Sequence, residues 1–222
     1  MKWLLQALVL VQLNTFAAGK DPETLMTVRG KQVVADDFSG PSISAAWTVQ
    51  AGKFALKGGA LSAVPSGDDH GTLRHEIAVR DAVIQFDFKL GRGGILHMSV
   101  NGVNGHGDHI VRVMLSEKGF DLRKDGSKTD TSDTHKVLDH AAVDLADGRW
   151  HTLVIEISGT QALAHIGDRH VLGSDPKIER PKGSFGFPMG GDALVDNVVV
   201  WEAKPNPQWP AAKAKLSHKT QQ

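Results

Sequence analysis

The chain has 222 residues, with 25 basic and 25 acidic side chains, 11 histidines and no cysteine. A chain of this length can form one sizeable domain with its own core. Because the charges balance, no basic surface for a polyanion is expected, and nucleic acid is excluded as a first candidate partner.

Residues 1–19 are typical of a secretory signal peptide. Lys2 gives a positive start, and residues 3–13 form an apolar run that is too short to span a bilayer. Small residues place the cleavage point after Ala17 or Gly19. The alternative is a membrane anchor, but no longer apolar segment follows. Because an exported domain of this size can fold without disulfides, we expect a secreted or periplasmic bacterial protein without an integral anchor.

Residues 20–32 are polar and are expected to form an irregular lead-in to one domain over residues 33–203. Within that domain, turn pairs such as Gly-Gly, Asn-Gly and Asp-Gly separate short segments rich in Val, Ile, Leu and Phe. Strands are predicted at 33–38, 47–50, 53–56, 60–64, 72–77, 82–90, 94–100, 110–115, 120–124, 150–158, 161–166, 169–172, 183–187 and 193–202.

The apolar residues of these segments recur with period two. Every second residue is apolar over residues 84–90, and residues 153–157 repeat the pattern. No window predicts a long amphipathic helix, although residues 141–146 fit one short helical turn. We therefore predict an all-β fold, an antiparallel two-sheet β-sandwich. A disordered tail is expected over residues 204–222, with docking of Trp209 on the domain as the alternative.

Polar side chains gather where strands 94–100 and 110–115 would form a hairpin. His97 shares a strand face with Ile95 and Ser99, while its apolar neighbours point the other way. The candidate catalytic residues are His97, His109 and Arg112. The candidate ligand-binding residues are Arg74, Glu76, Asn101, His106 and Asp108. For Arg74 and Glu76, which alternate along one strand, an ion pair is the alternative to a cleft wall.

A divalent ion, calcium or another, is a candidate cofactor. His106 and His109 are three residues apart with Asp108 between them, which fits a metal site. Asp192 with residues 196–197 fits a calcium site. The alternatives are a solvated turn for the first set and a turn or cap for the second. No metal ligand set is assigned.

Three tryptophans, Trp47, Trp150 and Trp201, stand at strand ends. Such residues are more often core plugs than platforms for sugar rings. Residues 125–133 are interpreted as a solvated loop without a role.

Several segments resemble known families. DGRWH at 147–151 and GDRHV at 167–171 are similar to the signature of laminin-G and concanavalin A-like jelly rolls. The motifs DDFSG, FDFKL and GSFGF, within residues 36–61, 86–96 and 183–200, resemble the DUF1080 family of secreted 3-keto-disaccharide hydrolase-like domains. The resemblance implies a concanavalin A-like jelly roll and a carbohydrate partner.

The family resemblance also implies a chemistry. In a 3-ketoglycoside the ketone acidifies the C2 hydrogen, so a histidine can act as the base and Arg112 as the partner of the enolate. The paired carboxylates of a family-16 glucanase, E-x-D-x-x-E, are absent. The family's central Asn-Ser and its final Leu-Gln are replaced by residues 92–93 (RG) and 187–188 (FP).

Three functions stay open from the sequence. The first is an exported carbohydrate-active domain that hydrolyses or eliminates 3-ketoglycosides. The second is a non-catalytic lectin-like module that binds glycan or protein. The third is a structural envelope protein without a small ligand.

Overall fold

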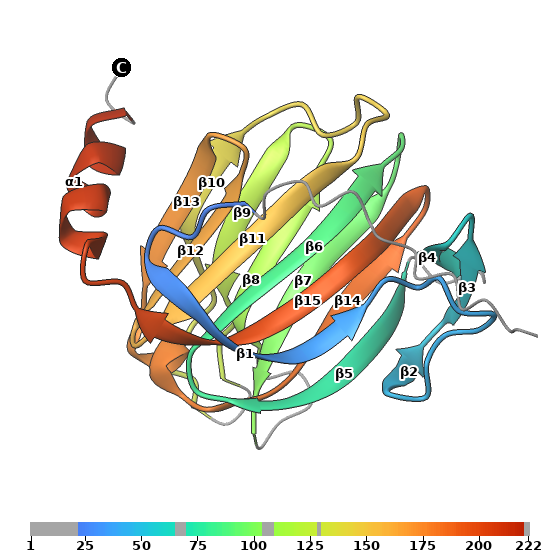
Figure 1. Cartoon of the computed structure of the whole chain (residues 1–222), viewed down its shortest axis with the longest axis horizontal. Coiled ribbons are helices and arrows are strands. Elements are labelled where there is room, and N and C mark those ends of the chain that lie inside the picture. The colour runs from blue at the N-terminus through green and yellow to red at the C-terminus, as the bar shows by residue number, and fades with distance from the viewer. Residues whose placement is uncertain (1–21, 65–69, 104–108, 128–129, 220–222) are drawn as a thin grey trace, which may run out of the picture.

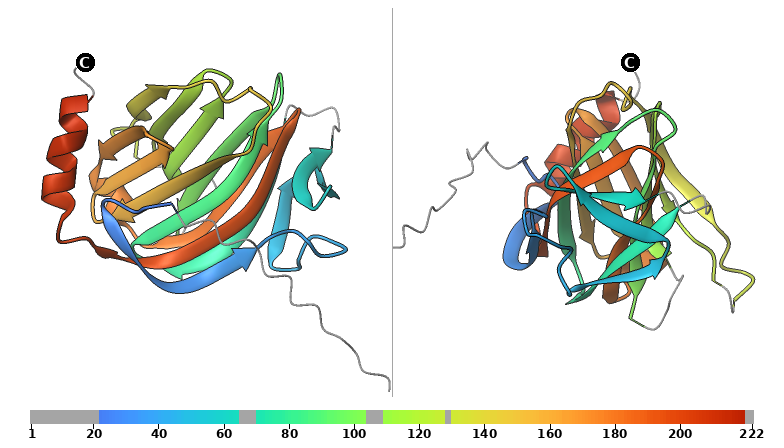
Figure 2. Two further views of the ribbon diagram at one scale, coloured as in Figure 1. Left: turned by 45° about the horizontal axis from the view of Figure 1, so that its top comes forward. Right: turned by 90° about the vertical axis from the view of Figure 1, so that its right-hand side faces the viewer.

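The computed structural model describes residues 22–64, 70–103, 109–127 and 130–219, and it confirms the predicted sandwich. Two antiparallel sheets face each other (Figures 1 and 2). In the described part of the chain no helix is both long enough and apolar enough to cross a membrane. The expected signal peptide lies outside the described residues.

The larger sheet has eight strands in the order β13-β12-β11-β6-β15-β4-β3, with β1 also paired to β15. Its strands are β1 (Thr27–Asp36), β3 (Lys53–Lys57), β4 (Ala60–Val64), β6 (Ala82–Leu90), β11 (His151–Ser158), β12 (Gln161–Ile166), β13 (Arg169–Ser174) and β15 (Ala193–Pro205).

The smaller sheet has seven strands in the order β10-β9-β8-β7-β14-β5-β2. Its strands are β2 (Trp47–Ala51), β5 (Gly71–Val79), β7 (Ile95–Gly102), β8 (His109–Ser116), β9 (Gly119–Lys124), β10 (Lys136–Ala142) and β14 (Lys182–Gly190). A short 3-10 helix, η1 (Pro176–Glu179), precedes β14.

The core lies between the two sheets, where the apolar side of each alternating strand is buried. Phe86 on β6 meets Phe187 on β14 across the sandwich, with ring centroids 5.0 Å apart and an interplanar angle of 76°. Such edge-to-face contact is a preferred aromatic geometry. Trp47 closes one end of the core: it is 6% exposed, and its indole N–H donates to Asp36 Oδ2 at 2.8 Å. It is therefore a core plug, as expected.

Two predicted boundaries were wrong. The lead-in is ordered from its later part onward, since β1 begins at Thr27 and pairs with β15. The tail is not irregular: β15 continues to Pro205, and helix α1 (Trp209–Lys219) follows beyond β12 and β13 at one end of the sandwich (Figure 1). Trp209 Nε1 donates to Gln161 Oε1 at 3.1 Å, which is the docking considered as the alternative.

Strand β10 was not predicted, and residues 141–146 do not form a helical turn. β10 lies at the edge of the seven-stranded sheet, and none of its residues is fully buried. An edge strand without a buried face shows no apolar alternation, so the periodicity that reveals the other strands is absent here.

Candidate functional site

The outer face of the seven-stranded sheet carries a row of polar residues that crosses five strands. Cross-strand partners place Arg74, Gly186, Ser99, Arg112 and Arg123 side by side on β5, β14, β7, β8 and β9. Directly opposed residues point to the same face, and their neighbours along each strand fill the core instead. We call these five residues the arginine row.

A second row runs parallel to it and consists of Glu76, Ser184, Asn101 and His109. Adjacent strands are about 4.8 Å apart, so Arg74 and Arg112 stand about 14 Å from each other across three strand spacings. Between them the floor is low, since Gly186 has no side chain and Ser99 has a short one. Gly186 and Ser99 are both buried, and the Arg112 guanidinium lies over Ser99.

Asp125, which directly follows β9, contacts three side chains at one end of the arginine row. Arg112 donates to Asp125 Oδ2 at 3.3 Å and to Ser99 Oγ at 3.3 Å. His109 Nε2 lies 3.9 Å from the same carboxylate oxygen, and His135 Nδ1 lies 3.3 Å from the other. One carboxylate thus orients an arginine and two histidines.

The second row is linked by side-chain hydrogen bonds. His109 Nδ1 lies 2.6 Å from Asn101 Oδ1, and the Asn101 amide donates to Ser184 Oγ at 3.1 Å. Asn101 and Ser184 are buried. Because one chain of contacts joins Ser184 to Asp125, the polar groups on this face are held in fixed positions.

Two buried lysines hold the loop that carries Asp125. Lys177 of η1 donates to the backbone carbonyl of Asp125 at 2.8 Å and to Asp133 Oδ2 at 3.0 Å. Lys124 pairs with the other carboxylate oxygen of Asp133. The hydrogen bond from Lys124 lowers the pKa of Asp133 and outweighs the effect of burial, which raises it. Asp125 and Asp133, which belong to a segment for which the sequence suggested no role, therefore help to position the site.

His97 lies on the same face, in a hollow of about 350 Å³ that is also lined by Met114, Asp121 and Arg123. Its Nδ1 is buried and has no hydrogen-bond partner among the described residues. Burial lowers the pKa of His97 to about 4, and the positive charge of Arg112 adds to the effect. The ring is therefore neutral at pH 7.

Asp121 forms a second carboxylate cluster beside that hollow. It pairs with Arg123, and His140 Nδ1 lies 2.5 Å from its Oδ1. Burial raises the pKa of Asp121, yet hydrogen bonds from Arg123 and His140 outweigh this and lower the pKa overall. Both arginines at this end of the row are thus paired with carboxylates.

The predicted site residues that the structure describes share this face. His109 and Arg112 meet at Asp125, and Asn101 joins them through His109. Three strands away, Arg74 forms an ion pair with Glu76, with Arg74 Nη2 and Glu76 Oε1 2.8 Å apart. His106 and Asp108 lie outside the described residues.

No group of three or more His, Cys, Asp or Glu residues suited to a metal ion occurs in the described ranges. At the candidate calcium residues, Asn197 adopts a φ of 49°, and its amide donates to Asp87 Oδ2 at 2.9 Å. Asn tolerates the left-handed conformation, and Asn197 lies at the irregularity in the pairing of β15 with β6, so it forms a bulge within the strand. The described residues give no ligand set for a metal, and no step is assigned to one.

No family model matches this chain, and no curated protein matches it either. Solved structures do match its fold. The CBM2 module of the evolved Dit of Lactobacillus casei BL23 phage J-1 gives a TM-score of 0.61 at 11% identity, over 82% of this chain and 99% of that one.

Two further structures agree. LamA from Zobellia galactanivorans, in complex with laminaritriose and laminaritetraose, gives a TM-score of 0.59 at 12% identity, over 79% and 100% of the two chains. A galectin-like protein of unknown function from Bacillus subtilis gives 0.61 at 13%, over 82% and 100%. The chain has a jelly-roll fold. At these identities the likeness establishes the fold alone, and the DUF1080 resemblance stays a prediction.

Proposed function

We propose that this protein binds a saccharide on the outer face of its seven-stranded sheet. The observation that carries the proposal is the arginine row, in which Arg74 and Arg112 flank a low floor of Gly186 and Ser99. Each arginine of the row is paired with a carboxylate, respectively Glu76, Asp125 and Asp121 for Arg74, Arg112 and Arg123.

Paired arginines and carboxylates suit the chemistry of sugar hydroxyls. A hydroxyl donates one hydrogen bond and accepts others, whereas guanidinium groups only donate and carboxylates only accept. A fixed pair therefore supplies both partners to neighbouring hydroxyls with charge-assisted strength. Because the pairs on this face are balanced in charge, we propose a neutral saccharide.

The solved structures with the same fold support this proposal. They include the CBM2 module, the carbohydrate-binding module CBM66 from Bacillus subtilis and LamA with bound laminaritriose and laminaritetraose. CBM66 gives a TM-score of 0.55 at 15% identity, over 73% of this chain and 100% of that one.

A glycan array followed by calorimetry with the best glycan tests the proposal. Arg112→Ala removes the guanidinium between Asp125 and Ser99, and affinity should fall by about tenfold or more. Arg80→Ala is the matched control, since Arg80 is 63% exposed in an ion pair with Glu179 and lies outside the row. Binding of no glycan, or equal losses in the two variants, contradicts the proposal.

A second candidate, action on 3-ketoglycosides, is favoured by His97. Its neutral ring and unpartnered Nδ1 fit a group that accepts a proton, and Arg112 is near enough to influence its pKa. In this reaction His97 takes the C2 proton, the C2–H electron pair forms the enolate, and the C1–O bond then breaks as C1=C2 forms; the departing oxygen takes up a proton.

The low pKa makes His97 a weak base, so simple binding ranks first. Turnover of a 3-keto-disaccharide that is lost in His97→Gln but retained in Arg80→Ala supports this second candidate. Binding of glycans without any turnover selects the binding module.

A further inference from the structure

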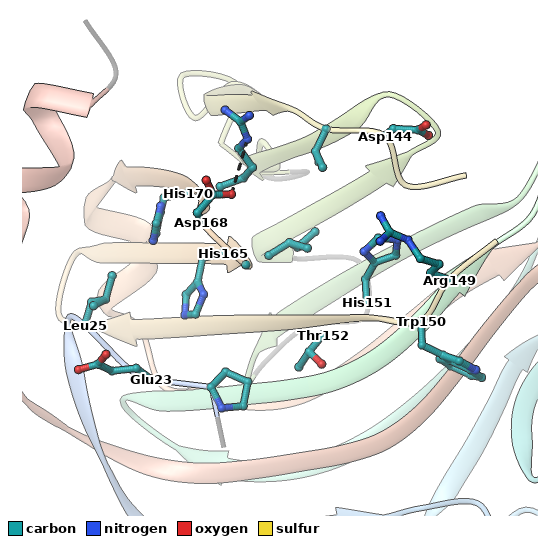
Figure 3. Close-up of a pocket in the computed structure, with 15 residues that line it drawn as sticks. Glu23, Leu25, Asp144, Arg149, Trp150, His151, Thr152, His165, Asp168 and His170 are labelled. Atoms are coloured by element: carbon teal, nitrogen blue, oxygen red, sulfur yellow. Dashed lines mark ion pairs between the residues drawn. The ribbon is translucent and has the colours of Figure 1, made fainter. Parts of the chain in front are cut away.

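A second, larger hollow lies on the eight-stranded sheet, away from the arginine row. It has a volume of about 810 Å³. Three pieces of chain surround it: residues 22–25, residues 149–152 at the start of β11, and residues 165–170 of the β12–β13 hairpin (Figure 3). Val143 and Asp144, which follow β10, complete the lining.

The hollow lies where the first residues of β11 extend beyond the end of the neighbouring strand β12. Pairing between β11 and β12 begins at Leu153 and Ile166, and the hairpin turns at Gly167, whose φ is 58°. His151 and Thr152 are paired only with β6 on their other side. A gap is therefore left in the sheet between the start of β11 and the hairpin.

The third wall is fixed in place by a buried carboxylate. Glu156 accepts hydrogen bonds from the backbone N–H groups of Leu25 and Met26, each at 2.8 Å, and it is fully buried. The segment over residues 22–25 is thereby held against the outer face of β11. A preformed hollow of this kind loses little freedom when a ligand enters.

Trp150 provides an aromatic surface at one end of the hollow (Figure 3). The sequence favoured a core plug here, and this was wrong: Trp150 is 46% exposed. An exposed indole at the rim of a hollow can cover the apolar face of a sugar ring. Trp47, by contrast, is buried in the core.

Polar groups of the β12–β13 hairpin face the hollow from another wall. His165 is almost fully buried and its Nε2 has no hydrogen-bond partner among the described residues; this nitrogen lies 3.9 Å from Glu156 Oε1. The His170 ring lies 5.5 Å from that of His165. Asp168 is exposed next to Arg169, with Oδ1 and Nε 3.8 Å apart.

The lining carries three carboxylates, Glu23, Asp144 and Asp168, and two guanidinium groups, Arg149 and Arg169. Arg149 pairs with Asp147, and Arg169 lies beside Asp168. Burial and the nearby charge of His170 lower the pKa of His165 to about 4, so its ring is neutral at pH 7. Such a lining offers donors and acceptors to hydroxyl groups.

We infer that this hollow is a second saccharide site, in which Trp150 covers a sugar ring and the groups of the hairpin at residues 165–170 bind its hydroxyls. The inference takes its ligand class from the proposed function but uses none of the residues of the arginine row. Two sites on different sheets allow one molecule to hold two saccharide chains, which raises avidity without any new contact.

Calorimetry and tryptophan fluorescence on the full chain, with laminaritriose, cellotriose and mannotriose as probes, test the inference. We expect a binding trisaccharide to shift tryptophan emission and to occupy two sites. Trp150→Ala should remove the emission shift and one site, leaving the site that Arg112→Ala removes. Trp150→Phe should keep the site with weakened affinity, because the ring face remains. Trp201→Phe is the control and should leave the shift in place.

The outcomes separate the two sites. Binding at one site that depends on Arg112 and is indifferent to Trp150→Ala overturns this inference and leaves the proposed function standing. Binding that depends on Trp150 alone supports the inference and contradicts the proposed function. A protein that binds none of the probes, and no member of a wider glycan array, contradicts both. Circular dichroism of Trp150→Ala confirms that an exposed side chain was removed without unfolding.

Discussion

Thr27 gives both its backbone N–H and its hydroxyl to Glu156 Oε2, at 2.7 and 2.8 Å. The two residues lie 129 positions apart and are both fully buried. With Leu25 and Met26 also donating, one carboxylate satisfies three backbone N–H groups where the chain enters the sandwich. An interior carboxylate is tolerable only with such partners.

Glu156→Ala should therefore destabilise the protein strongly. The substitution leaves buried donors without an acceptor, and we expect a loss of about 3 kcal/mol or more in the free energy of unfolding. Denaturation in urea measures it. Thr27→Val, which removes only the hydroxyl, should cost about 1 kcal/mol. Equal stability of Glu156→Ala and the parent protein would contradict the role of Glu156 in holding residues 25–27.

Stability should fall as the pH drops from about 6.5 to about 4, in part because of His97. Its pKa is lowered to about 4 by burial first and by Arg112 second. The unfolded chain takes up the proton near pH 6.5, so this contribution is complete above that pH and is lost on acidification toward 4. Because the His97 ring is partly exposed and solvent screens its charge, we expect the free energy of unfolding to fall by about 2 kcal/mol over this pH range.

Urea denaturation across this pH range checks the effect of His97. His97→Gln should flatten the dependence by that amount. The control is Arg80→Ala, because the side chain of Arg80 is 63% exposed and lies away from His97, so the dependence should stay unchanged. A pH profile that is the same in His97→Gln and the parent protein contradicts the assignment.

Lys177→Met should weaken saccharide binding although Lys177 is not a residue of the arginine row. Lys177 holds both Asp125 and Asp133, so its loss frees the loop that orients Arg112. We expect affinity to fall by about fivefold. The amide of Ser127, which donates to the Asp133 carbonyl at 2.8 Å, should exchange faster with solvent.

Lys136→Met is the matched control for Lys177. Lys136 also approaches an aspartate, with its Nζ 3.5 Å from Asp175 Oδ2, but its side chain is 57% exposed. Neither affinity nor exchange at Ser127 should change. A similar change in both variants would mean that the loop does not depend on Lys177.

Gly186→Ala should disturb the floor of the arginine row. A Cβ at Gly186 would lie 2.3 Å from the carbonyl oxygen of Leu73, so β14 and β5 would have to separate. We expect a cost of about 2 kcal/mol or more and weaker binding. At Gly40 the nearest atom to such a Cβ is 3.5 Å away, and Gly40→Ala should be nearly neutral. Thermal unfolding of the two variants distinguishes them.

The strands were predictable because burial on one side leaves a period of two in the sequence. Residues 84–90 show this plainly, and β6 has the predicted bounds. The face shared by His97 and Ser99 followed from the same period, and the hairpin pairing brought Arg112 opposite Ser99. Strand β10 left no such trace, because Val137 within it is 53% exposed.

The placement of Asp125 and the hollow beside Trp150 could not be predicted, because both depend on contacts between residues far apart in the chain. Lys124 and Lys177 are buried, whereas lysine is normally exposed, so nothing local linked them to Asp133 or to the placement of Asp125. The hollow beside Trp150 arises from the offset of β11 against β12. The sequence of a single strand does not determine its register with a neighbour, so this hollow could not be predicted.

The pairing of Thr27 with Pro205 has a mechanical consequence. The described chain enters and leaves the sandwich at the same end of one antiparallel pair. Tension applied through these two points would peel β1 from β15 one hydrogen bond at a time instead of shearing the whole pair at once. If both ends were tethered, the first contacts to bear the load would be the hydrogen bonds from Leu25, Met26 and Thr27 to Glu156, which hold the segment that walls the hollow.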